Sequence, residues 1–310
     1  MLARTADALY WMARYTERAE NMARLLDVTY RMSLLPHSGE RGYWGAALGI
    51  TGLDRAYAQS HDRIGAAEVL RFMVLDPANP SSILACLRLA RENAHAVRGT
   101  LTTETWETVN STWLEARANA ARELQGAELA SFFDWVKYRS HLSHGVVVGT
   151  MLHDEAFHFI RLGTFLERGD NTARILDVKF DELAPREAPA ADYYEWGALL
   201  RSVSAFEIYR KVFRDVITPE RVAELLILRN ELPRSLAACM SAVVEILRIV
   251  ANERSAETAR RAGALHARLQ FGRLEDILER GLHRFLTEFL EHTAEVGKRI
   301  SADFLVPMRR

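Results

Sequence analysis

One fourteen-residue segment occurs twice in this chain and constrains its fold more than any other feature. Residues 15–28 read YTERAENMARLLDV and residues 165–178 read FLERGDNTARILDV. The two segments share these pairs, each separated by 150 residues: Glu17/Glu167, Arg18/Arg168, Asn21/Asn171, Ala23/Ala173, Arg24/Arg174, Leu26/Leu176, Asp27/Asp177 and Val28/Val178. Most shared residues are polar, which an ordinary amphipathic helix pattern does not explain. The chain therefore contains an internal duplication.

A second pair of segments extends the duplication. VLRFMVLDPANPSSILACL (69–87) aligns with VAELLILRNELPRSLAACM (222–240) at a spacing of 153 residues. The alignment matches Pro80/Pro233, Ser82/Ser235, Ala85/Ala238 and Cys86/Cys239. No glycine-, serine- or proline-rich linker lies near residue 150, which argues against flexibly tethered domains. We predict two homologous halves, residues 1–153 and 154–310, packed as one body.

The pattern between the prolines is helical throughout. The eight prolines fall where helices would start or stop, and the segments between them show apolar residues at a period of 3.6. We predict an all-α, internally duplicated helical bundle with two pseudo-symmetric halves, long helices and no sheet. The first helix is expected from about Thr5 to Leu34. The glycine-rich segment 38–52 lacks the Lys-Ser/Thr of a phosphate-binding loop and is predicted to be a mobile loop between helices.

Composition and charge exclude several classes of protein. The 310 residues are 49% hydrophobic and carry a formal net charge of −1, so no overall field attracts nucleic acid or an acidic membrane. The longest apolar stretch, GVVVGTML (145–152), is too short to span a bilayer. Charged residues interrupt the apolar runs of the N-terminal segment, which argues against a signal peptide. The two cysteines, Cys86 and Cys239, are too few for a disulfide framework and do not have the spacing of a metal-binding motif. We expect buried thiols in a cytoplasmic protein that binds neither nucleic acid nor membrane.

The duplicated polar residues are candidate site residues. At 100° per residue, Glu17, Asn21 and Arg24 lie within about 60° of one another, and their counterparts Glu167, Asn171 and Arg174 do the same. We call these six residues the polar seam. Apolar residues on both sides predict that the seam is buried, so its charges must be paired. Either the two copies satisfy each other, or they line a cleft where arginine binds a carboxylate or phosphate and glutamate binds an amine.

The structural alternative predicts a particular packing. If the two helices run antiparallel about a pseudo-twofold axis, Glu17 lies opposite Arg174 and Glu167 opposite Arg24, with Asn21 and Asn171 near the axis. A parallel packing is expected to place like charges together at a cost in repulsion. Arg18 and Arg168 lie about 100° from the neighbouring glutamates and are expected to face a partner helix or solvent.

The chain resembles the alpha-E family, bacterial all-helical proteins named for a Glu-Arg motif and built as a tandem duplication. The residues that carry the resemblance are Glu17-Arg18, Glu167-Arg168, NPSSILACLRLARENA (79–94) and the LG-x-FLER approach at 162–168. The resemblance implies a role in peptide synthesis or modification. Such proteins accompany circularly permuted ATP-grasp amide ligases, transglutaminase-like proteins and an N-terminal-nucleophile peptidase.

The resemblance implies an accessory or binding subunit more than an enzyme. Its expected partners are an ATP-grasp-type amide ligase and a peptide substrate, and it can form a homo-oligomer. The binding candidates are Glu17, Arg18, Asn21, Arg24, Glu167, Arg168, Asn171 and Arg174. The alternative is an enzyme in which Glu17 and Glu167 act as acid and base while Arg24 and Arg174 bind an anion.

Two further groups of residues rank below the polar seam. Arg88, Glu92 and His95 share one helical face, and Glu92 recurs as Glu245, so these four are second-rank candidates. Two Glu-x-x-His units, at residues 92–95 and 155–158, leave a di-metal carboxylate bundle as a remote alternative. Neither histidine recurs in the other half, so we predict no metal and no cofactor. Three further histidines cluster near the boundary between the halves: His141, His144 and His153.

Overall fold

The computed structural model describes residues 1–34, 40–120, 127–182 and 189–305. Its helices are α1 Ala3–Ser33, α2 Glu40–Thr51, α3 Asp54–Ala58, α4 Ala66–Val74, α5 Ile83–Ala96, α6 Thr103–Ala120, α7 Ala127–Thr150, α8 Glu155–Glu182, α9 Pro189–Ser202, α10 Phe206–Phe213, α11 Pro219–Ile227, α12 Leu236–Ile249, α13 Ala256–Gln270, α14 Leu274–Arg280 and α15 Leu282–Ile300. A short π-helical turn, Ser301–Leu305, follows. The described residues contain no strand, which confirms the all-α prediction.

The helices follow the same order twice. Helices α1 to α6 correspond to α8 to α13, and α7 corresponds to α15, with α14 added in the second set. The clearest pair is α5 and α12, which are both 14 residues long and begin 153 residues apart. Each is capped by a matched serine: the hydroxyl of Ser82 accepts from the Ala85 N–H, and that of Ser235 from the Ala238 N–H. The internal duplication is confirmed in the fold, while the division at residues 153/154 stays a prediction.

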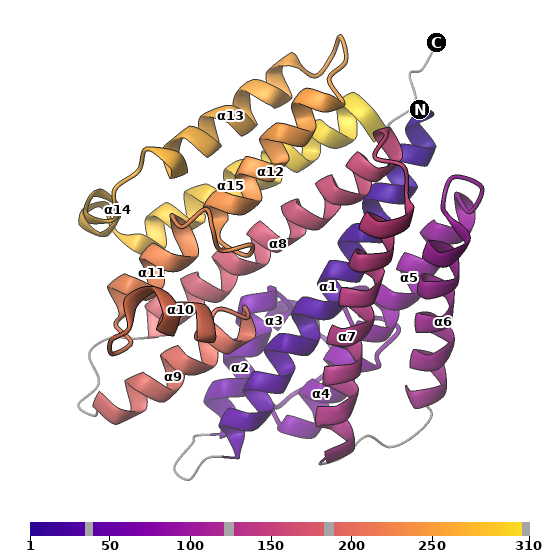
Figure 1. The fold of residues 1–310 in the computed structure, drawn as a ribbon. Coiled ribbons are helices and arrows are strands. Elements are labelled where there is room, and N and C mark those ends of the chain that lie inside the picture. Colours follow the sequence, from indigo (N-terminus) through magenta and orange to yellow (C-terminus); the bar gives the residue numbers. More distant parts are fainter. Residues whose placement is uncertain (35–39, 121–126, 183–188, 306–310) are drawn as a thin grey trace.

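The two longest helices lie together at the centre of the molecule. Figure 1 shows α1 beside α8, with α5 and α7 flanking α1 and with α12 and α15 flanking α8. The two helices run in the same direction, since the amino group of Met1 lies 2.6 Å from Glu155 and Arg14 lies 2.7 Å from Glu167. The prediction of an antiparallel pair is therefore wrong.

Helices α1 and α8 approach closely at Gly163. A Cβ atom placed on Gly163 would lie 2.3 Å from the Tyr10 carbonyl oxygen and 3.3 Å from the Ala13 side chain. Ala13 occupies the equivalent position of the first copy, 150 residues earlier. Small residues at this point in both copies let the two backbones come near enough for the charged side chains beyond them to meet.

The Gly163→Ala substitution should lower the free energy of unfolding by about 1–3 kcal/mol, because the added methyl group must push the helices apart. Chemical denaturation monitored by circular dichroism measures this loss. The control is Gly263→Ala in α13, where a Cβ atom meets nothing within 4 Å. It should stabilise the helix by about 0.5–1 kcal/mol. Equal effects of the two substitutions would contradict the close approach.

The glycine-rich segment differs from the prediction. Residues 40–51 form α2 instead of a mobile loop, and residues 35–39 lie outside the described residues. Trp44, Ala47 and Leu48 are at most 1% exposed and recur at helical spacing. Burial of this apolar face outweighs the poor helix propensity of the intervening glycines. The first helix agrees with its prediction to within two residues at each end.

The two cysteines are equivalent in the fold. Cys86 and Cys239 are unpaired and buried, and each thiol lies near a proline carbonyl oxygen, that of Pro80 or Pro233. Burial raises the pKa of both thiols to about 12. Such thiols remain protonated and unreactive, as predicted. None of the described helices combines the length and the apolar character that crossing a bilayer requires.

Candidate functional site

The two Glu-Arg dipeptides pair with each other across the α1–α8 interface. Arg168 donates to both carboxylate oxygens of Glu17, at 2.9 and 2.8 Å. Arg18 donates to both oxygens of Glu167, at 2.6 and 3.1 Å. The Glu17 side chain is 0% exposed and that of Glu167 is 7% exposed. We call these two reciprocal, bidentate ion pairs the crossed pairs.

The crossed pairs correct the predicted partners of the two glutamates. The halves do exchange Glu–Arg contacts, but the partners are Arg168 and Arg18 instead of Arg174 and Arg24. Of the two surroundings expected for Arg18 and Arg168, partner helix or solvent, the structure shows the partner helix, because the long arginine side chain reaches across to the glutamate of the other copy. In the parallel packing each glutamate therefore meets an arginine, and like charges do not stack.

The arginines of the polar seam pair within their own helices. Arg24 donates to Glu20 at 2.8 Å, and Arg174 donates to Asp170 at 2.7 Å, both at i,i+4 spacing. The Arg24 side chain is 9% exposed, whereas that of Arg174 is 41% exposed. The prediction of a buried seam is thus correct for Arg24 and wrong for Arg174. Glu20 and Asp170 are site residues that the sequence analysis did not select.

A buried network surrounds the first copy alone. Arg234, at the loop before α12, donates to Glu17 at 3.0 Å, to Asn21 at 2.9 Å and to Glu20. Ser140 of α7 donates to Glu20 at 2.6 Å. The residue equivalent to Arg234 in the first half is a serine, so this network has no copy around the second glutamate.

The second glutamate has a different additional partner. Arg14 donates to Glu167 at 2.7 Å and also to the Tyr10 hydroxyl. The amide nitrogens of Asn21 and Asn171 are buried and have no hydrogen-bond partner among the described residues. The two asparagines therefore do not bond to each other through these atoms.

The arginines keep both carboxylates of the crossed pairs ionised. Burial alone would raise the pKa of Glu17, but Arg168 and Arg234 outweigh it and hold that pKa well below its usual value. Burial likewise opposes ionisation of Glu167, and Arg14 and Arg18 lower its pKa overall. Neither carboxylate titrates near neutral pH, where a general acid or base must act.

Two histidines of α7 border the network. Arg24 lies 3.0 Å from His141 Nε2, and because arginine only donates, that nitrogen must be unprotonated and accept. Burial lowers the pKa of His141, which agrees with a neutral ring carrying its proton on Nδ1. His144 Nε2 lies 3.2 Å from Glu17, and since the ionised carboxylate only accepts, this nitrogen carries the proton.

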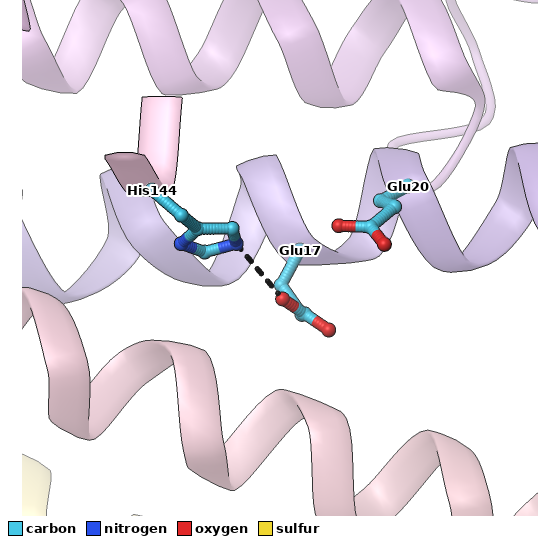
Figure 2. A group of neighbouring side chains, drawn as sticks. All are labelled: Glu17, Glu20 and His144. Carbon is cyan, nitrogen blue, oxygen red and sulfur yellow. Dashed lines mark hydrogen bonds and ion pairs between the residues drawn. The ribbon is translucent and has the colours of Figure 1, made fainter. Parts of the chain in front are cut away.

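Figure 2 shows Glu17, Glu20 and His144 side by side, the first two on α1. Their ligand atoms all lie within 4.8 Å of one another, and no other such trio occurs in the described part of the chain. The charge around them does not suit a cation, because Arg24, Arg168 and Arg234 already contact the two carboxylates. The Glu-x-x-His residues of the di-metal alternative do not join this group.

A groove opens on each side of the crossed pairs. The first groove lies between α1, α7, α8 and the loop before α12, has a volume of about 670 Å³, and is lined by charged and imidazole groups that include Arg24, His141, His144, Arg161, Arg168 and Arg234. The second groove lies between α1, α8 and α15, has a volume of about 410 Å³, and is lined by residues that include Trp11, Arg14, Arg18, Asp170, Arg174 and Lys298. The crossed pairs thus separate two grooves.

The second-rank candidates lie away from the grooves. Arg88 and Glu92 form an exposed i,i+4 ion pair on α5, and His95 packs against the Trp106 ring. Glu245 is exposed on α12. The structure does not bring these four residues into one site with the crossed pairs.

These features define an all-helical protein made by internal duplication, whose two central helices are joined by reciprocal Glu–Arg pairs. A family model described as a predicted alpha-helical domain with a conserved ER motif matches residues 1–305, and the chain belongs to this family, Alpha-E.

The relatives found include uncharacterized proteins of Mycobacterium bovis and of two strains of Mycobacterium tuberculosis. Each is 28% identical over 309 residues, an alignment that covers 93% of this chain and 35% of the relative. The chain therefore spans about a third of the length of these relatives. No solved structure matches the chain significantly.

Proposed function

We propose that this chain is a helical binding component of a bacterial peptide synthesis or modification system. In this role it binds an ATP-grasp-type amide ligase, the peptide substrate, or both. The peptide synthesis or modification system is inferred from the resemblance to the Alpha-E family. The role as a binding component is supported by one observation, the closure of the crossed pairs.

The crossed pairs act as a structural joint. Both glutamates are buried. Each accepts hydrogen bonds on both carboxylate oxygens from an arginine of the other helix, and each accepts a further hydrogen bond from a second arginine. A catalytic carboxylate needs access to substrate and a pKa near the working pH. Glu17 and Glu167 meet neither need, so the alternative of an enzyme that uses them as acid and base has no support in the geometry.

The joint leaves the two grooves beside it available for binding. The larger groove has a volume of about 670 Å³, which suits a small ligand or a peptide end. Two of its walls are α1 and α8, whose spacing the joint fixes. In this arrangement the motif positions the binding surface and does not react.

Reconstitution tests the proposal directly. The full chain is purified and mixed with the ATP-grasp-type ligase of its own organism, and direct binding is measured by calorimetry. We then expect ATP-dependent amide formation on the peptide to be faster with the chain present than with the ligase alone. The chain alone, with peptide and ATP, should form no amide bond.

Two outcomes would refute the role as a binding component. One is the absence of both ligase binding and peptide binding. The other is amide-bond chemistry by the chain alone that disappears in a folded Glu17→Gln variant. The matched control is Glu92→Gln, which removes an exposed carboxylate from α5 and should change neither binding nor rate.

A further inference from the structure

We propose that the first groove binds an oxyanion, a carboxylate or phosphate group carried on a ligand with an apolar body. Four guanidinium groups line this groove, and no aspartate or glutamate does so among the residues that the structure describes. This site is a property of the isolated chain, so it stands or falls separately from the peptide-system role.

The charge balance of the first groove favours an anion. Arg24, Arg168 and Arg234 are paired with Glu17 and Glu20, which lie buried behind the lining. Arg161 adds a fourth guanidinium, so four cations face two carboxylates and leave an excess of two positive charges. Low-dielectric walls concentrate such a field and attract an ion of opposite sign.

Arg161 is the group best placed to bind the oxyanion. Its guanidinium lies 5.6 Å from the Phe157 ring centroid and 5.3 Å from that of Phe165, and it has no carboxylate partner among the described residues. Arg168, about two helical turns after Arg161 on α8, lies 5.6 Å from the same Phe165 ring. Phe165 therefore supports both arginines on one face, and the planar donor fork of Arg161 remains available for a carboxylate or phosphate.

The rest of the lining specifies the ligand further. His141 is neutral and carries its proton on Nδ1, so it lines the groove without adding charge. Much of the remaining wall is apolar and includes Val147, Ile160, Ile208 and Leu232. A free inorganic ion would leave this wall in contact with water, whereas an oxyanion on an apolar body would cover it.

The second groove does not share these properties. The residue equivalent to Arg161 in the first copy, 150 residues earlier, is Trp11, which lines the second groove. The carboxylate of Asp170 also lines the second groove. Lys298 also lines it, with no ion pair among the described residues. The crossed pairs are duplicated, but of the two grooves beside them the first alone has a basic lining without an acid among the described residues, so the site is assigned there.

Titration of the full chain at low salt tests the site, with binding followed by calorimetry. The probes are inorganic phosphate and an N-acetylated dipeptide with a leucine at its C-terminus, used once as the free carboxylate and once as the amide. We expect the carboxylate peptide to bind at least about tenfold more tightly than its amide. If inorganic phosphate binds and the carboxylate peptide does not, the site is assigned to a phosphate-bearing ligand. Binding of neither would overturn the proposal.

Matched variants locate the binding. Arg161→Gln removes a cation that makes no ion pair with the residues that the structure describes, so the fold should persist, and we expect oxyanion binding to weaken about tenfold. Lys298→Gln removes the same charge from the second groove and should change the affinity by less than about twofold. Equal weakening by both variants, or none by Arg161→Gln, would show that the first groove is not the site.

Discussion

Replacing Glu17 with alanine should lower the free energy of unfolding by about 3–5 kcal/mol. The substitution leaves Arg168, 13% exposed, and Arg234, 7% exposed, next to each other without the carboxylate that joins them. It also removes the acceptor of His144. Removing one partner of a buried ion pair costs far more than the pair itself contributes, because the remaining charge stays out of water. Urea denaturation of the two purified proteins measures the difference.

The control is the exposed ion pair on α5. Glu92→Ala removes the partner of Arg88, where both side chains are more than 40% exposed. It should cost no more than about 0.5 kcal/mol, as is usual for an exposed i,i+4 pair. If Glu17→Ala costs as little as Glu92→Ala, the crossed pairs are solvated and cannot serve as the joint between the halves.

Patterns within single helices predicted most of the fold. The 3.6-residue period and the prolines located long helices, and the repeated segments located the duplication. The pattern could not give the relative direction of α1 and α8. Two helices with buried charges can satisfy them in either direction when arginine, with its long side chain, lies next to glutamate. The antiparallel prediction considered only residues on one stripe and so did not pair Arg18 and Arg168 with the glutamates.

The candidate site could be predicted only where the repeat marks it. Glu20 carried a usable signal, since an acid precedes the arginine by four residues in both copies, at Glu20/Arg24 and Asp170/Arg174. Arg234 carried none, because it lies 217 residues from Glu17 in the sequence and its counterpart is Ser81. Contacts present in one half only leave no trace in a self-comparison of the sequence.

Some charged residues of the central helices are the same in both copies, and others differ between them. The Glu-Arg dipeptides keep both halves together and are the same in both, because each copy supplies the partner of the other. Groove-lining residues outside these pairs have no such mutual constraint and can differ between the copies, as Arg161 and Trp11 do. Duplication of this kind allows one groove to acquire a ligand site while the joint remains symmetric.

The protein should lose stability steeply as the pH falls below about 4.5. The pKa values of Glu17 and Glu167 in the folded chain lie below the ordinary value of 4.5, because burial, which would raise them, is outweighed by arginines. The unfolded chain therefore binds more protons than the folded chain in this range. The stabilisation is complete above the unfolded pKa and is lost as the pH falls through the folded pKa. Each pKa unit by which the folded value lies below the unfolded value contributes about 1.4 kcal/mol per carboxylate to the free energy of unfolding.

Urea denaturation at a series of pH values between about 7 and 3 measures this loss. The Glu167→Gln variant should be less stable than the parent at neutral pH but should lose less stability on acidification, because one of the perturbed carboxylates is absent. Glu92→Gln, at an exposed carboxylate, should follow the parent curve. If Glu167→Gln loses as much as the parent between pH 5 and 3, then Glu167 is not ionised against Arg18 in the folded protein, and the second crossed pair does not exist as an ion pair.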